Sequence, residues 1–325
     1  MPDTMKQSPR GGLVRGIQVL AVATLVATVG LIVLGSAVRV TNSGMGCNGW
    51  PLCSGQVGPI SHFHPLMEQS HRFLASIVTV LIVVLAFLAR RAGALARHVR
   101  GPALASVGVI AVQIVLGAIT VVTNNAPVTV ALHLLVATLF LAVVTVTAVA
   151  SFIEPERSWS LLHRPRRLAW AAVGGLYLVV ISGSIVVNAG AQSACASWPA
   201  CSSSPAAMGL VVIQLVHRSM VLVGSLLVVA FLVSVWRKRG TDPVERQLSF
   251  FALVLLAAQI VVGALSALYS SHTEFADVHL ALASALWATV VAVFALSARE
   301  RTVKEPGPRS DDPTSSDPPI THVLS

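Results

Sequence analysis

The chain has 325 residues, of which 55% are hydrophobic and only 11% are charged, and its mean hydropathy is +0.79. This composition excludes an ordinary soluble globular domain and indicates an integral membrane protein. The net charge of +9 does not indicate nucleic-acid binding, because the basic residues flank apolar segments instead of forming one patch.

A membrane-spanning helix needs about 20 mainly apolar residues. Eight stretches meet this requirement: 16–38, 70–89, 103–122, 130–152, 168–188, 209–235, 248–270 and 277–298. The first follows a short basic start, but its apolar core is too long for a signal peptide, so we expect it to span the membrane as well. The sequence therefore predicts an all-α integral membrane protein with eight transmembrane helices.

The basic residues predict the orientation of these helices. Of the 22 Lys and Arg residues, Arg39, Arg72 and Arg218 fall at one face, and the other 19 fall in the N-terminal arm, three loops and the C-terminal tail at the opposite face. The positive-inside rule makes that opposite face cytoplasmic, with both termini inside. The tail after about residue 302 has a composition typical of disordered segments.

All four cysteines fall in two loops of the predicted outer face. They form two equally spaced pairs, CNGWPLC (47–53) and CASWPAC (195–201). An even number of external cysteines favours two disulfides, Cys47–Cys53 and Cys195–Cys201. A metal site made of four thiolates and a set of free loop thiols are the alternatives.

Further matching segments show that the chain is duplicated. They are SHRFLAS (70–76) with VHRSMVL (216–222), QIVLGAIT (113–120) with QIVVGALS (259–266), and ALHLL (131–135) with DVHLA (277–281). The helical segments lie 146 residues apart and the cysteines 148. Each copy holds four spans, so the two copies form tandem, same-orientation four-helix bundles related by an axis along the membrane normal.

This duplication predicts the domain organisation of the chain. The predicted parts are a cytoplasmic N-terminal arm (1–15), an N-terminal four-helix repeat (16–152), a cytoplasmic linker (153–167), a C-terminal four-helix repeat (168–298) and a disordered cytoplasmic tail (299–325).

Four of the ten histidines recur in the repeat, each near the outer end of an even-numbered span: the N-terminal pair, His71 and His133, and the C-terminal pair, His217 and His279. A lone histidine in an apolar helix is usually a satisfied buried polar group. Four at one depth indicate ligands, because polar groups inside a membrane are costly and usually functional. Two facing imidazoles suit the axial positions of haem iron, whereas zinc wants a third and usually a fourth ligand.

Residues beside the histidines also repeat. Gly117 and Gly263 each lie one turn after a glutamine, where a flat macrocycle needs room; ordinary packing of small residues is the alternative. Arg72 and Arg218 directly follow the first histidine of each pair, which makes them candidate contacts for haem propionates. Snorkelling to lipid phosphate is the alternative for the arginines.

One difference between the halves indicates different roles. Glu68 lies three residues before His71, on the same helix face, and its counterpart three residues before His217 is Gln214. A carboxylate exchanges protons and an amide does not. We therefore expect chemistry at the N-terminal pair with Glu68, and a resident, electron-handling haem at the C-terminal pair. The alternative is that Glu68 only caps a helix start.

Together, these features resemble the haem A synthase family. The resemblance covers residues 16–298 and lies in the duplicated eight-span layout, the Glu68-x-x-His71 motif, the histidines that open spans four, six and eight, and the two C-x5-C loops with Trp-Pro inside. It implies oxidation of the C8 methyl group of haem O to a formyl group, by two successive hydroxylations through a gem-diol. The product is haem A for terminal oxidases.

The resemblance also implies residue roles and partners. The C-terminal pair would bind a haem b cofactor, and the N-terminal pair the substrate haem O. Glu68 would accept protons or stabilise a cationic intermediate at the methyl carbon, and the Cys47–Cys53 pair would be structural or take part in electron or haem transfer. The expected partners are haem O synthase, terminal oxidase assembly, an unidentified electron acceptor and the lipid bilayer of a bacterial cell. Nucleic acid is not among them, and homo-oligomers are left open.

Two other functions compete with this interpretation. A di-haem membrane cytochrome that only transfers electrons explains the four histidines and the repeat, but not the replacement of Glu68 by Gln214. A transporter with histidine proton relays would also suit duplicated halves, but its polar residues should lie at mid-bilayer and not at one face.

Overall fold

A computed structural model describes residues 9–47, 49–53, 55, 61–162, 165–201, 206–238, 242–269 and 273–299. Most of the predicted N-terminal arm, the tail after Arg299, and His163, His272 and His322 lie outside the described residues.

The described part of the chain forms eight long helices, and a 3-10 helix, η1 (Gly93–Ala96), precedes the third. They are α1 (Pro9–Val40), α2 (Phe63–Arg91), α3 (Arg97–Val122), α4 (Pro127–Ser151), α5 (Arg167–Asn188), α6 (Met208–Trp236), α7 (Pro243–Leu268) and α8 (Thr273–Ser297). All eight are long and apolar enough to cross a membrane. The prediction of an all-α protein with eight transmembrane helices is confirmed.

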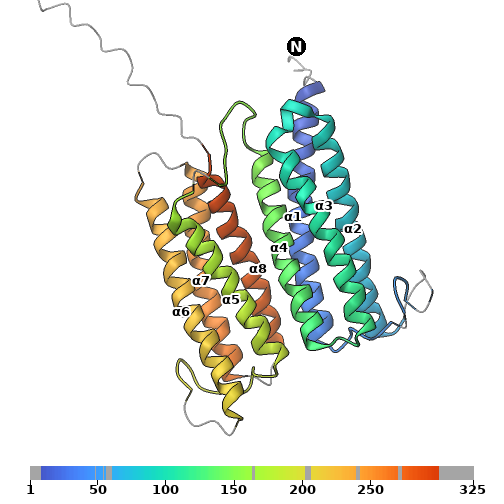
Figure 1. Cartoon of the computed structure of the whole chain (residues 1–325), viewed down its shortest axis with the longest axis vertical. Coiled ribbons are helices and arrows are strands. Elements are labelled where there is room, and N and C mark those ends of the chain that lie inside the picture. The colour runs from blue at the N-terminus through green and yellow to red at the C-terminus, as the bar shows by residue number, and fades with distance from the viewer. Residues whose placement is uncertain are drawn as a thin grey trace, which may run out of the picture.

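The helices pack as two groups of four. In the first group, α1 contacts α2 and α4, and α3 contacts α2 and α4; in the second, α5 contacts α6 and α8, and α7 contacts α6 and α8. The groups meet through α4 and α8, with α1 packed on α8 and α5 on α4 (Figure 1). The helices that carry the second histidine of each pair therefore lie at the centre of the molecule.

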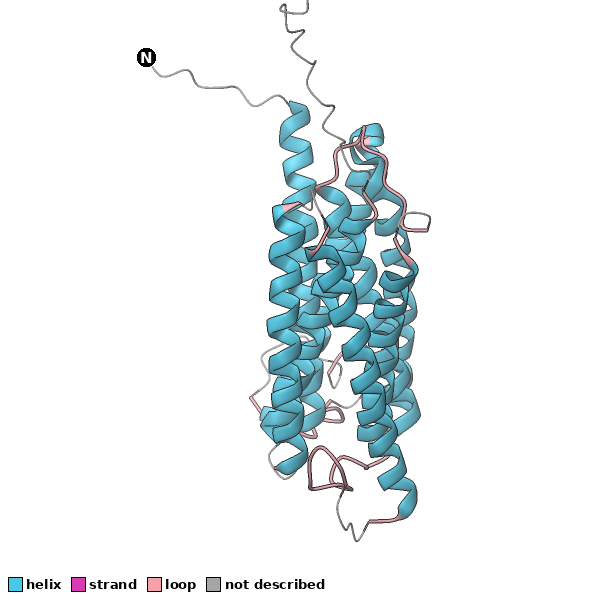
Figure 2. Ribbon diagram, turned by 90° about the vertical axis from the view of Figure 1, so that its left-hand side faces the viewer, coloured by secondary structure: helices cyan, strands magenta, loops and turns pink. Residues whose placement is uncertain are grey.

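The two ends of the molecule differ in what they carry. The helices lie along one common axis, and the loops that connect them are at its two ends (Figure 2). The loops with the cysteines lie at one end, called the disulfide face below, and the start of α1 lies at the other (Figure 1). Each of the four histidines lies within roughly three turns of the start of its helix, near the disulfide face.

Several helices extend beyond the predicted spans. The second begins at Phe63 and not at residue 70, and the third at Arg97 and not at residue 103, so that His98, which the predicted spans leave in a loop, is part of a helix. Hydropathy detects the apolar part of a helix only. Loop groups contact the polar first turns of both helices: Ser43 Oγ lies 2.9 Å from His64 Nδ1 on α2, and the Arg157 carbonyl lies 3.0 Å from His98 Nε2 on α3.

Side chains from both groups bury the boundary between them. Trp287 on α8 is 3% exposed and donates from its indole nitrogen to the Thr138 carbonyl of α4. Tyr177 on α5 stacks on Trp287 and donates its hydroxyl to the Leu135 carbonyl of α4. These contacts fix α4, which carries His133, against the second group.

Candidate functional site

Two disulfides close the loops at the disulfide face. Cys47 is bonded to Cys53 and Cys195 to Cys201, and no cysteine is left free in the described chain, which includes all four. The predicted pairing is confirmed. The two alternatives, a four-thiolate metal site and free loop thiols, are wrong.

Two arginines hold these loops against the helices. Arg72 Nη1 donates to the carbonyl oxygens of Gly49 at 2.9 Å and Pro51 at 3.2 Å. Arg218 makes the equivalent contacts in the second half, donating to the carbonyl oxygens of Ser197 (2.7 Å), Pro199 (3.1 Å) and Cys195 (3.0 Å). The loops thus take up Nη1 of Arg72 and both Nη1 and Nη2 of Arg218. The expected contact with haem propionates stays a prediction, and it would have to use the remaining N–H groups.

Loss of one of these arginines should loosen its loop without breaking the disulfide. We expect Arg218→Ala to speed amide exchange in residues 195–201 and to lower stability by about 1–2 kcal/mol, since hydrogen bonds from a charged donor are lost. Exchange measured by mass spectrometry and thermal melting in detergent would test this. Arg246→Ala, at an exposed position on α7, is the control. If residues 195–201 exchange equally fast in both variants, Arg218 does not hold the loop.

Glu68 and Gln214 also tie their helices to the loops, with opposite polarity. The Glu68 carboxylate is 4% exposed, accepts the Cys47 amide N–H at 2.9 Å and forms an ion pair with Arg72. Gln214 instead donates, to the carbonyls of Ala191 at 2.9 Å and Gln192 at 3.1 Å. Helix α2 begins five residues before Glu68, so the alternative that Glu68 caps a helix start is wrong.

Each of the four histidines packs against a glycine on the preceding helix. The distances from an added glycine Cβ to the imidazole Cε1 are 2.9 Å for Gly35 and His71, 3.3 Å for Gly117 and His133, 3.2 Å for Gly183 and His217, and 2.8 Å for Gly263 and His279. We call these four glycines the histidine seats. Sequence reasoning singled out Gly117 and Gly263 but missed Gly35 and Gly183.

The seats show what the small residues do for the side chains that are present. The absence of a side chain at Gly117 and Gly263 lets an imidazole approach the helix closely. That these glycines also make room for a macrocycle stays a prediction. The two missed seats precede the first histidine of each pair, and their spacing, 148 residues, is that of the cysteines. That spacing was the sequence signal that could have identified them.

Polar neighbours of the histidines differ between the halves. Ser182 Oγ lies 2.8 Å from His217 Nδ1 and also donates to the Val179 carbonyl at 2.8 Å. Because the serine proton is used by that carbonyl, the histidine Nδ1–H is the donor, which leaves Nε2 with its lone pair for a metal. The position equivalent to Ser182 in the first half is Leu34.

The second histidine of each pair contacts a glutamine. Gln113 Nε2 lies 3.1 Å from His133 Nε2, and Gln259 Nε2 lies 3.2 Å from His279 Nε2. These are the glutamines that precede the second seat in each repeat. They orient an imidazole nitrogen in the interior of each helix group.

The four histidines fit haem ligation, because several of their buried ring nitrogens have no hydrogen-bond partner. In the part of the chain that the structure describes, Nδ1 of His71, His133 and His279 is buried and has no hydrogen-bond partner. Buried polar atoms are normally satisfied, so such atoms indicate a ligand. Within the same residues no group of three or more metal-binding side chains forms, so zinc lacks a third ligand there.

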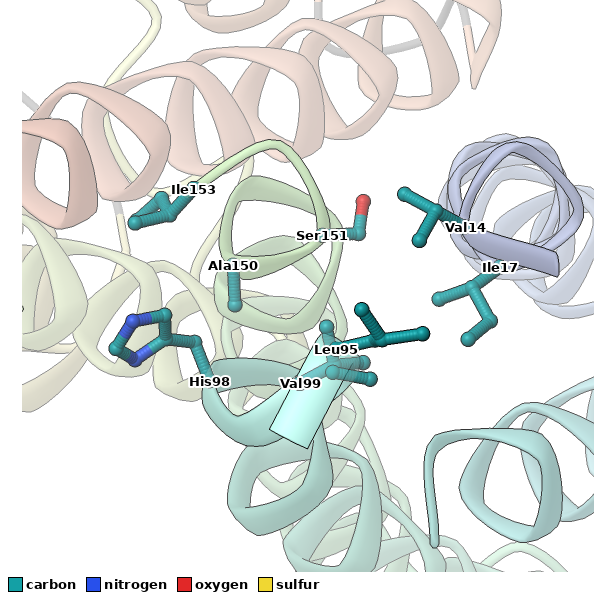
Figure 3. Close-up of a pocket in the computed structure, with 9 residues that line it drawn as sticks. Val14, Ile17, Leu95, His98, Val99, Ala150, Ser151 and Ile153 are labelled. Atoms are coloured by element: carbon teal, nitrogen blue, oxygen red, sulfur yellow. The ribbon is translucent and has the colours of Figure 1, made fainter. Parts of the chain in front are cut away.

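A small pocket lies at the end of the molecule away from the disulfide face. It is lined by Val14, Ile17, Leu95, Ala96, His98, Val99, Ala150, Ser151 and Ile153 (Figure 3). Its volume of about 10 Å³ holds roughly one water molecule. His98, at its side, bonds the Arg157 carbonyl at 3.0 Å. This pocket is therefore no site for a large substrate, and His98 has a structural partner.

Comparison with known proteins identifies the class. Residues 18–291 match the COX15-CtaA family, described as cytochrome oxidase assembly protein. Because the match covers most of the chain, this membrane protein belongs to that family.

Three relatives of this chain are each named haem A synthase. Haem A synthase of Geobacillus kaustophilus is 29% identical over 297 residues, 88% of this chain and 93% of that protein. Haem A synthase of Geobacillus thermodenitrificans is 29% identical over 315 residues, 94% of this chain and 99% of that protein. Haem A synthase of Bacillus pumilus is 27% identical over 271 residues, 80% and 87% of the two chains. The resemblance to the haem A synthase family is confirmed.

Proposed function

We propose that the protein oxidises the C8 methyl group of haem O to the formyl group of haem A. The observation that carries this proposal is the set of four histidine seats: two imidazoles in each helix group, all near the disulfide face, each backed by a glycine. Membership of the haem A synthase family supports the reaction. Each helix group carries one histidine pair. The proposed reaction needs one pair for a resident haem and the other for the substrate haem.

The C-terminal pair, His217 and His279, is assigned to a resident haem b. Ser182 supports this assignment, because it fixes the tautomer and orientation of His217 as a partner behind a permanent ligand should. A haem bound there supplies one-electron chemistry. The protein contributes the orientation of the imidazoles and an apolar surrounding.

The N-terminal pair, His71 and His133, is assigned to the substrate haem O. A substrate must leave after oxidation, and the absence of a serine behind His71 suits a site that is not permanently filled. Glu68 lies on the His71 face of α2, with its carboxylate fixed by the Cys47 amide and by Arg72. This position allows Glu68 to accept protons released as the methyl group is oxidised.

Glu68→Gln tests the reaction. In cells that also make haem O synthase, the wild-type protein should contain haem b together with haem O, a hydroxylated intermediate or haem A. Glu68→Gln should keep haem b and reduce haem A by at least about a hundredfold, since a positioned acid–base group contributes typically 10²–10⁴. The haems are extracted and identified by chromatography with mass detection.

A control separates chemistry from loop anchoring. Glu68→Gln also removes the charge that pairs with Arg72 and weakens the hydrogen bond from the Cys47 amide, so loop exchange is measured in the same samples. Arg72→Lys, which keeps a cation beside Glu68 and loosens the loop, should retain more haem A formation than Glu68→Gln does. If both variants lose haem A in proportion to loop exchange, Glu68 acts through the loop.

A di-haem cytochrome is the second candidate, and one observation favours it. The contacts of Glu68 with Cys47 and Arg72 give this residue a structural role, so its presence does not require chemistry. Haem b alone, in a host shown to make haem O, would establish the cytochrome. A protein without any haem would overturn both candidates and would favour the transporter.

Orientation and partners belong to the same proposal. We infer that the disulfide face is outside the cell and both termini are cytoplasmic, because the 19 other basic residues flank the opposite helix ends. Haem O synthase would supply the substrate, a terminal oxidase would receive the product, and an electron acceptor would complete the reaction.

A further inference from the structure

One polar contact joins the two helix groups at the disulfide face. Ser36 on α1 is 3% exposed and donates its hydroxyl to the Asp277 carboxylate on α8. Arg39, one turn further along α1, is acted on electrostatically by the same carboxylate. The end of α1 thus presents a hydroxyl donor and a cation to one carboxylate of the other helix group.

This contact exists on one side of the duplicated structure only. The equivalent helix contact, by the repeat, is that of α5 with α4. The equivalent residues are Ser184 for Ser36, Val187 for Arg39 and Ala131 for Asp277. Ser184 keeps the hydroxyl but bonds within its own helix, accepting from Asn188 at 3.2 Å. The carboxylate and the cation are thus present at only one of the two equivalent contacts.

Helix α1 leads from this contact to the N-terminal pair. Gly35, the residue before Ser36, is the seat of His71, with an added Cβ only 2.9 Å from the imidazole. A displacement of this turn of α1 therefore moves the surface on which His71 lies. Asp277 is two residues from His279, a spacing at which helical side chains do not face the same way.

We propose that Asp277 is a positioning residue for the N-terminal histidine pair, which it serves from the helix that carries His279. By holding Ser36 and Arg39, it keeps the last turns of α1, and with them the seat of His71, in place. The functional part of this proposal rests on the assignment of the N-terminal pair to the substrate haem. A substitution of Asp277, two residues from His279, should therefore impair substrate binding at the N-terminal histidine pair in the other half.

Amide exchange of the full-length protein tests the contact itself. Asp277→Ala should speed exchange in residues 33–41 about tenfold, because the charge-assisted hydrogen bond from Ser36 and the attraction between Asp277 and Arg39 are lost. Asp277→Asn, which keeps an acceptor for Ser36, should have a smaller effect. Ser184→Ala is the matched control and should leave exchange at the end of α5 unchanged. Unchanged exchange in Asp277→Ala would overturn the proposal.

Haem content tests the consequence. In cells that make haem O synthase, Asp277→Ala should lower haem O plus haem A per protein about five- to tenfold and leave haem b unchanged. Selective loss of haem b would mean that Asp277 acts locally on His279 and would overturn the proposal. A wild-type protein that binds no haem would instead overturn the proposed function, while the exchange data would still decide the contact.

Charge reversal covers the case in which Asp277→Ala folds poorly. Asp277→Arg places a second cation beside Arg39 and should expose the end of α1. The double variant Arg39→Asp with Asp277→Arg should restore at least part of the exchange protection. Failure of the double variant to protect better than Asp277→Arg alone would count against the contact.

Discussion

His217→Ala should yield a protein without haem b and without haem A formation. Nδ1 of His217 is held by Ser182 at 2.8 Å, which makes it the most firmly oriented imidazole of the four. Removing a partner behind a ligand typically costs about 10- to 100-fold in metal affinity, and removing the ligand itself should cost more. Haem b per protein, measured after extraction, should fall at least about a hundredfold.

His71→Ala should give the complementary result. Haem b should stay at the wild-type level, because the C-terminal pair lies in the other helix group. Haem O and haem A should both disappear from the purified protein. His98→Ala, at the end of the molecule away from the disulfide face, is the control and should retain both haems. If His71→Ala and His217→Ala lose the same haem, the assignment of one haem to each pair is wrong.

The helices and the cysteine pairing could be predicted because their signals are local. Twenty apolar residues form a membrane-spanning helix in almost any context, and an even number of cysteines in external loops favours disulfides. The ends of α2 and α3 were predicted six or seven residues short. Those turns are polar, and their helical state depends on loop contacts such as that of Ser43 with His64, which no hydropathy window detects.

The histidines could be found from the repeat, but their surroundings could not. Gly35 and Gly183 matter because they meet an imidazole on the next helix, and such a contact exists only once the helices are packed. The same holds for Arg72 and Arg218, whose guanidinium groups turned out to bind loop carbonyls. Side-chain direction at a helix end is decided by the loop that covers it.

Differences between the two halves are therefore the most informative part of the structure. The two helix groups make matching contacts, so a residue that differs at an otherwise repeated contact is a candidate for a specific role. Ser182 supports His217 and has Leu34 as its counterpart, Glu68 accepts where Gln214 donates, and Asp277 replaces Ala131. The first difference favours a permanent haem in the second half, and the other two concern the proposed substrate site in the first.

The histidine seats give the second large expected effect. Gly263→Ala should displace His279, and Gly35→Ala should displace His71, because the added methyl carbon would lie 2.8 Å and 2.9 Å from an imidazole carbon. Such overpacking typically costs about 1–3 kcal/mol. We expect Gly263→Ala to lower haem b content and Gly35→Ala to lower haem O and haem A content, each by about tenfold or more.

The four seats form a graded series with internal controls. Gly117→Ala and Gly183→Ala bring the methyl carbon only to 3.3 Å and 3.2 Å, so a small shift of the imidazole should accommodate it and the haem loss should be milder. Gly30→Ala, on α1 as Gly35 is, meets nothing within 4 Å and should be neutral or slightly stabilising, since alanine is the better helix former. Haem loss in Gly30→Ala equal to that in Gly35→Ala would show that the helix backbone, and not the seat, is responsible. Retention of both haems in Gly263→Ala and Gly35→Ala would show that these imidazoles do not need their present positions to bind haem.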